Sequence, residues 1–155
     1  MSKPRRLLIV LADGEHARFL AYGSDHLLRA DTAMDSIVAH KRSAALGSDR
    51  PGAAFHSDSS AHHALAPRHD LHALEKDKFA GTLADHLNKA AAENAFDDLL
   101  LVAPARTLKT IREGLDRPTA GRLAGAIEKD LVKVPTDELA PHLAPWVRPA
   151  ERAAP

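Results

Sequence analysis

Histidine and carboxylate side chains gather in one polar stretch of this 155-residue chain, residues 40–70. Five histidines cluster in its later part or just beyond it, namely His56, His62, His63, His69 and His72, and Asp58 and Asp70 lie among them. Imidazole and carboxylate groups are good ligands for zinc or nickel, and imidazole also acts as an acid or base near neutral pH. The spacing matches no compact ligand pattern, and a flexible loop does not preorganise ligands. We therefore expect a solvated polar loop, without a metal or another cofactor.

The same stretch carries cations that are suited to phosphate groups. The candidate binding residues in or beside it are Lys41, Arg42, Ser48, Asp49, Arg50, Gly52 and Arg68. Arginine binds phosphate through paired hydrogen bonds, and serine hydroxyl or backbone N–H groups add further contacts. Phe55 is the one aromatic side chain of the stretch that is available for base stacking. These residues predict a surface for RNA, and a loop with ordinary surface charge is the simpler alternative.

Further polar residues follow two apolar runs of the sequence. Asp13 comes directly after residues 7–12, and Arg106 and Thr107 come shortly after residues 99–103. If the runs are neighbouring parallel strands, these residues meet at the carboxyl edge of the sheet, where open α/β sheets bind ligands. A helix that starts there also favours anions. The alternative is that Asp13 belongs to a hairpin turn and Arg106 to the surface of a first helical turn.

The N-terminal apolar pattern predicts an antiparallel meander. Residues 7–12 are continuously apolar, which is typical of a strand buried on both faces. Asp13-Gly14 is a strong hairpin signal. Residues 16–22 and 27–34 are the second and third predicted strands, and the third is expected at an exposed edge of the sheet, where other strands can pair.

The second half predicts alternating helices and strands. With Asp70 as N-cap, a helix is expected to about Asn94, and its apolar face comprises Leu71, Leu74, Phe79, Leu83 and Leu87. The later predicted elements are a strand at 99–103, helices at 106–115 and 119–124, a strand at 127–134 and a short helix at 136–143, capped by Thr136.

Strands that alternate with helices indicate parallel βαβ units with right-handed crossovers. The predicted fold class is thus α/β: a single three-layer αβα domain with a mixed five-stranded sheet in the order 3-2-1-4-5. The first strands form the antiparallel meander, and the last two are parallel. We expect this domain to span residues 1–144, with a long functional or disordered loop at 40–70 and a flexible tail at 145–155.

Composition and missing motifs argue against several classes of function. Lys+Arg and Asp+Glu both total 21, so the formal net charge is zero, which argues against a protein that coats nucleic acid by bulk charge. The absence of cysteine excludes thiol catalysis and Cys-ligated metals. No apolar stretch is long enough for a membrane span or a signal peptide, so a cytoplasmic location is expected. Walker A, GxGxxG, GxSxG and HExxH motifs are also missing from the sequence.

Several short motifs, taken together, are similar to those of one protein family. They are Ala12-Asp13-Gly14 with Ala17-Arg18-Phe19, Leu46-Gly47-Ser48-Asp49-Arg50-Pro51-Gly52 with Phe55, Pro67-Arg68-His69-Asp70 with Glu75-Lys76-Asp77-Lys78-Phe79-Ala80, Leu101-Val102-Ala103-Pro104-Ala105-Arg106-Thr107-Leu108, and Lys129-Asp130-Leu131. On these motifs the chain resembles the bacterial host-attachment protein family over most of residues 6–143. The family name refers to attachment of bacteria to host cells and implies little about a molecular mechanism.

That family in turn resembles the middle domain of archaeal and eukaryotic class-one peptide-chain release factors, in the ribosomal L18/S11-like αβα group. There, the segment before the long helix carries a Gly-Gly-Gln tip that promotes peptidyl-tRNA hydrolysis. The equivalent segment here has no Gly-Gly pair, and the whole chain has no glutamine. The hydrolytic chemistry therefore cannot be transferred. The resemblance implies an αβα body that presents a loop to RNA or a ribosome.

Three functional hypotheses follow. The first is a non-enzymatic binding module of the host-attachment family that engages RNA, the ribosome or a protein through residues 40–70. The second is a hydrolase for a phosphate-containing substrate that uses Asp13 and the histidines of the 40–70 stretch. The third is a factor in cell attachment with a protein or glycan partner, acting indirectly because no export signal is present. The sequence does not predict an oligomeric state.

Overall fold

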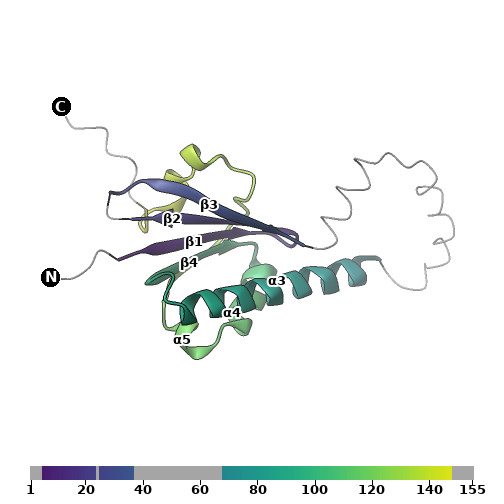
Figure 1. Cartoon of the computed structure of the whole chain (residues 1–155). Helices are drawn as coiled ribbons and strands as arrows, with labels where there is room; N and C mark the ends of the chain where they lie inside the picture. The colour runs from purple at the N-terminus through teal and green to yellow at the C-terminus, as the bar shows by residue number, and fades with distance from the viewer. Residues whose placement is uncertain (1–4, 24, 37–67, 148–155) are drawn as a thin grey trace.

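A five-stranded mixed sheet forms the centre of the computed structural model, which describes residues 5–23, 25–36 and 68–147. The strands are β1 (Leu7–Ala12), β2 (His16–Tyr22), β3 (Leu28–Asp35), β4 (Asp98–Ala103) and β5 (Leu123–Glu128). Their order is β3-β2-β1-β4-β5, with antiparallel pairing from β1 through β3 and parallel pairing of β4 with β1 and β5 (Figure 1). The predicted α/β class, mixed sheet and strand order are confirmed.

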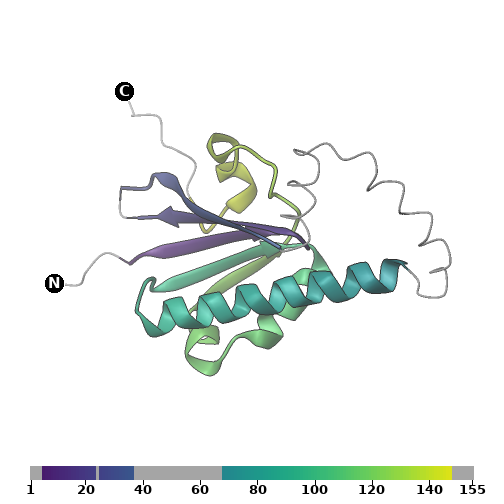
Figure 2. The same ribbon diagram turned by 45° about the vertical axis from the view of Figure 1, so that its right-hand side comes forward.

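Different layers cover the two faces of the sheet (Figure 2). One face carries α3 (Arg68–Ala92), α4 (Ala105–Gly114) and α5 (Arg117–Ala120), and the other carries the short 3-10 helices η2 (Thr136–Glu138) and η3 (Ala140–Leu143). Successive strand residues point to opposite faces. Val10 and Leu101 accordingly pack under the long helices, whereas Ile9 and Leu100 pack under the C-terminal segment.

The long helix α3 extends beyond the end of the sheet (Figure 1). It begins at Arg68, so Asp70 lies in the first turn rather than at the N-cap, in a position where a carboxylate suits the helix dipole. Leu71 and Leu74 were predicted to join the apolar face of this helix, but they are 53% and 56% exposed. The prediction is wrong for these two leucines because the sheet does not extend underneath them. The side chains of residues 68–70 and 72 are not described.

The last strand lies earlier in the chain than predicted. Instead of residues 127–134, β5 comprises Leu123–Glu128, and the preceding helix is α5 rather than residues 119–124. Alanine and glycine in Leu123–Glu128 have weak strand preference, which concealed the strand. Leu131 and Val132 suggested a strand because they are apolar, but they are buried in the core cluster beneath the C-terminal segment.

The C-terminal segment packs as two 3-10 turns rather than as one helix capped by Thr136. Pro135 precedes η2, and no side-chain cap is formed there. Trp146 lies against Gly125, where an added Cβ atom would be 2.4 Å from Cζ2 of the indole ring. Val147 is also buried in the core cluster, so the packed residues continue past position 144.

The outer strand β3 has features that oppose pairing with another strand. A bulge interrupts its register with β2, because Phe19 pairs with Thr32 and Leu20 pairs with Ala30. Asp31 is the extra residue, and Arg29 and Asp35 add charge along the same exposed strand. Bulges and charges are common devices that protect sheet edges.

One arginine joins the sheet to the C-terminal layer. The guanidinium of Arg18 on β2 donates hydrogen bonds to the carbonyl oxygens of Val132 and Val134, at 2.7 and 2.5 Å, and to the hydroxyl of Thr136, at 2.9 Å. These bonds connect positions more than one hundred residues apart in the chain. They hold the segment after β5, which covers the core residues on the second face of the sheet, such as Ile9 and Leu100.

Replacing Arg18 should therefore destabilise the whole domain. We expect Arg18→Ala to lower the free energy of unfolding by about 2–3 kcal/mol, because hydrogen bonds to charged groups are worth about 1.5–3 kcal/mol. Arg18→Lys should recover part of this loss. Urea denaturation monitored by circular dichroism measures the change. Arg117→Ala, an exposed change on α5, is the control, and an equal effect of both alanine variants would contradict the anchoring role.

Candidate functional site

The carboxyl ends of β1 and β4 form the edge at which the sequence predicted a site. The parallel register pairs Leu11 with Val102, so Asp13 lies level with Pro104, the residue that precedes α4. Asp13 and the first turn of α4 are therefore brought to one edge of the sheet. This edge is where open α/β sheets place their ligands.

Asp13 closes the hairpin between β1 and β2. Its Oδ1 accepts hydrogen bonds from the backbone N–H of Glu15, at 2.8 Å, and of His16, at 2.7 Å, and its own N–H donates to the carbonyl of His16. Gly14 is buried under α3, where an added Cβ atom would lie 2.3 Å from Cγ of Lys76. Asp13 thus has the turn role that was the alternative to a ligand role.

Arg106 connects α4 to α3. Its Nη2 and Nε donate to the carboxylate of Asp77, at 3.1 and 3.4 Å, and this hydrogen bonding together with the opposite charge raises the pKa of Arg106 above its ordinary value. Thr110 donates to the same carboxylate at 3.5 Å. The pair is largely exposed to solvent. Salt therefore screens it, and its main effect is on the relative position of the two helices.

The start of α4 has an unusual combination of features. No side chain caps it, and its first turn contains no acidic residue. Thr107 is buried there, with 7% of its surface exposed. Backbone N–H groups at such an end favour anions. The structure thus brings Asp13, Arg106 and Thr107 to one edge, but it gives Asp13 and Arg106 separate partners within the fold.

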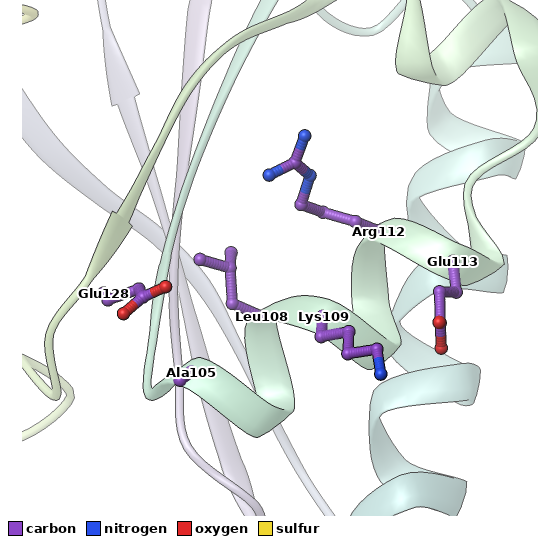
Figure 3. A pocket seen from close by; sticks show the side chains of 6 residues that line it. All are labelled: Ala105, Leu108, Lys109, Arg112, Glu113 and Glu128. Atoms are coloured by element: carbon purple, nitrogen blue, oxygen red, sulfur yellow. The ribbon is translucent and has the colours of Figure 1, made fainter.

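An open groove of about 380 Å³ adjoins this edge, between α4 and the end of β5 (Figure 3). Leu108 extends from α4 toward Glu128, whereas Lys109 and Glu113 extend away from it (Figure 3). Arg112 also lines the groove, so its charges comprise two cations and two carboxylates. This balance selects for neither an anion nor a cation. We assign the groove no ligand.

The side chains of the remaining predicted site residues lie outside the part of the chain that the structure describes. Lys41, Arg42, Ser48, Asp49, Arg50 and Gly52 lie outside the described residues, as do His56, His62 and His63. Arg68 is the first residue of α3, but its side chain is not described. Among the side chains that the structure describes, no group of three His, Asp or Glu could hold a metal ion.

The sequence pattern did not reveal Asp77 as the partner of Arg106. The two residues are 29 positions apart, on different helices. A helical pattern assigns each of them to an exposed face but does not show which faces meet. The signal would have been their opposite charge, which many other pairs in the chain share.

The sequence of this chain matches a family model over residues 8–143, and the family is described as "Protein required for attachment to host cells". Comparison with curated proteins gives no match. Among solved structures, the chain is similar to the crystal structure of the archaeal translation termination factor aRF1, with a TM-score of 0.48 and 11% sequence identity. That match covers 81% of this chain but only 30% of the other. None of the described helices is both long enough and apolar enough to cross a membrane.

Two substitutions of Asp13 separate the contribution of its hydrogen-bond acceptor to the turn from that of its negative charge. We expect Asp13→Ala to lower the free energy of unfolding by about 1–2 kcal/mol, because two hydrogen bonds to the turn are lost. Asp13→Asn retains an oxygen acceptor, so it should stay close to the parent protein in urea denaturation. A loss of stability in the asparagine variant equal to that in the alanine variant would show that the negative charge, rather than the acceptor, holds the turn.

Proposed function

The chain belongs to the family of proteins required for attachment to host cells, and from this assignment we propose that it is a binding module rather than an enzyme. Its binding surface comprises the projecting end of α3 and the adjoining residues 40–70. RNA, free or in the ribosome, is the partner that the cations of this segment fit best. An effect on attachment is then indirect, through this partner.

The projecting end of α3 is the observation that carries the proposal. Helix α3 continues beyond the sheet, where it leaves Leu71 and Leu74 exposed (Figure 1). The last described residue before this segment, Ser36, follows β3, and its final residues, from Arg68 on, form the start of α3. The chain thus leaves the described body after β3 and re-enters it at the start of α3. A projecting helix end can be reached by a large partner.

The contacts at the carboxyl edge support binding over catalysis. The carboxylate of Asp13 is engaged by backbone N–H groups of its own hairpin, and the guanidinium of Arg106 is paired with Asp77. The hydrolase hypothesis requires these two groups to act on one substrate together with a histidine. Such a site would first have to release both groups from contacts that hold the fold.

A protein partner is the second candidate, and the exposed leucines favour it. Leu71 and Leu74 are three residues apart on α3, so they share one helix face. Arranged in this way, apolar side chains are typical anchors for a partner protein. Leucine side chains make no favourable contact with phosphate groups. Binding that depends on Leu71 and Leu74 therefore indicates a protein partner rather than RNA.

Cosedimentation of the full chain with purified ribosomes and with bulk RNA, over a range of salt concentrations, tests the proposal. We expect retention at low salt that falls steeply as salt rises, since cations are released when Lys and Arg bind phosphates. For single-stranded RNA, each lost phosphate contact should reduce the slope of log K against log salt by about 0.7. The double variant Arg42→Ala with Arg50→Ala removes two such contacts and should reduce the slope by about 1.4.

Two controls make the outcome decisive. Arg29→Ala removes an exposed cation of β3 and should leave the retention unchanged. Leu71→Ser with Leu74→Ser should matter only for a protein partner, whose binding should depend weakly on salt. Absence of retention at every salt concentration, or retention unaffected by all these variants, would reject the binding surface proposed here.

A further inference from the structure

A second groove, of about 450 Å³, lies between the end of β3 and the middle of α3. Its volume falls in the range of typical ligand sites. Phe79 is part of its lining and is itself 4% exposed. The other lining residues are polar or small: Asp35, Ser36, Glu75, Lys78, Gly81, Thr82 and Asp85. This groove is separate from the one beside α4.

The charges of this groove are predominantly negative. Asp35, Glu75 and Asp85 contribute three carboxylates, and Lys78 contributes a single ammonium group, whose Nζ lies 3.8 Å from Glu75. Oδ1 of Asp35 is hydrogen-bonded to Nδ1 of His16 at 2.8 Å. Carboxylates of this kind repel RNA and attract Lys and Arg side chains. The groove therefore suits a basic partner, whereas the cations of residues 40–70 suit an anionic one.

Gly81 provides an observation independent of charge. Glycine in the interior of a helix is less favourable than alanine, because it loses more backbone freedom on folding. At Gly14, Gly114 and Gly125 an added Cβ atom would lie within 2.7 Å of a side-chain atom, so close packing accounts for these glycines. At Gly81 an added Cβ atom would meet no atom within 4 Å. The described residues thus leave open space at this lining residue.

We propose that this groove binds an extended, basic segment of a partner protein. Lys or Arg side chains of the segment pair with Glu75 and Asp85, and its backbone passes close to α3 at Gly81. The apolar surface of Phe79 receives the aliphatic parts of the basic side chains, which long cationic residues commonly bury. This partner surface is distinct from the RNA surface proposed above, and it does not depend on that proposal.

The test is fluorescence anisotropy with the full chain and a labelled peptide in which Arg and Ala alternate. We expect saturable binding that the same peptide with Glu in place of Arg does not show. Asp85→Asn should weaken binding about two- to fivefold, as expected for one partly exposed ion pair. Gly81→Gln should weaken it about tenfold or more, because its side chain occupies the space of the ligand.

Matched controls separate the groove from general charge effects and from misfolding. Asp31→Asn removes a carboxylate of β3 that does not line the groove, and Ala92→Gln adds the same side chain at the far end of α3; both should bind like the parent protein. Gly81→Gln should raise the melting temperature by about 2–4 °C, since glutamine is a better helix former than glycine. Lost binding in this variant then cannot result from unfolding.

Three results would overturn the proposal: no binding of the Arg peptide, equal weakening by Asp31→Asn and Asp85→Asn, or unchanged binding in Gly81→Gln. RNA retention in the sedimentation assay should be the same for Asp85→Asn and the parent protein. The two proposed surfaces can therefore fail independently of each other.

Discussion

Burial of the central strands on both faces is the constraint on which the rest of this structure depends. Residues 9–12 of β1 and 99–103 of β4 have no measurable exposure. Fully burying one side chain of leucine, isoleucine or valine contributes about 1.5–3 kcal/mol. Strands of this kind need a covering layer on each side. The helices α3 and α4 supply one layer, and the segment after β5 supplies the other.

The second layer is short, which explains its dependence on specific contacts. Its 3-10 turns have three and four residues and offer little regular hydrogen bonding of their own. Arg18 holds this layer from β2 through three hydrogen bonds. At the end of this layer Trp146 packs against Gly125, and its indole N–H donates a hydrogen bond to the carbonyl of Ala124. Polar anchors and one large aromatic ring thus replace the packing of a long helix.

This constraint also explains which parts of the fold could be predicted from the sequence. The limits of β1 and β2 match the prediction because continuous apolar residues and an Asp-Gly turn are strong local signals. β5 was misplaced because parallel pairing with β4 stabilises a strand whose own sequence, rich in alanine and glycine, favours none. Leu71 and Leu74 were misassigned because a helical pattern does not indicate where the sheet beneath it ends.

The candidate site likewise has one part that could be predicted from the sequence and another that could not. Register along parallel strands is predictable, so the sequence placed Asp13 near the start of α4. The partner of Arg106 was not predictable, since the pairing of Asp77 with Arg106 depends on how two helices lie against each other. The open space at Gly81 is likewise a property of the folded chain. Glycine in a helical pattern shows only that the helix is weakened there.

A formal net charge of zero conceals the charge pattern of this protein. In the sequence, residues 40–70 carry Lys41, Arg42, Arg50 and Arg68, whereas carboxylates of the middle of α3 line a groove beside the end of β3. With a screening length of about 8 Å at physiological salt, each group of charges acts on its own surroundings rather than on the molecule as a whole. A chain with balanced composition can thus concentrate charges of opposite sign in different parts of its sequence. Its net charge therefore bears on binding through bulk charge but not on the charge of a single surface patch.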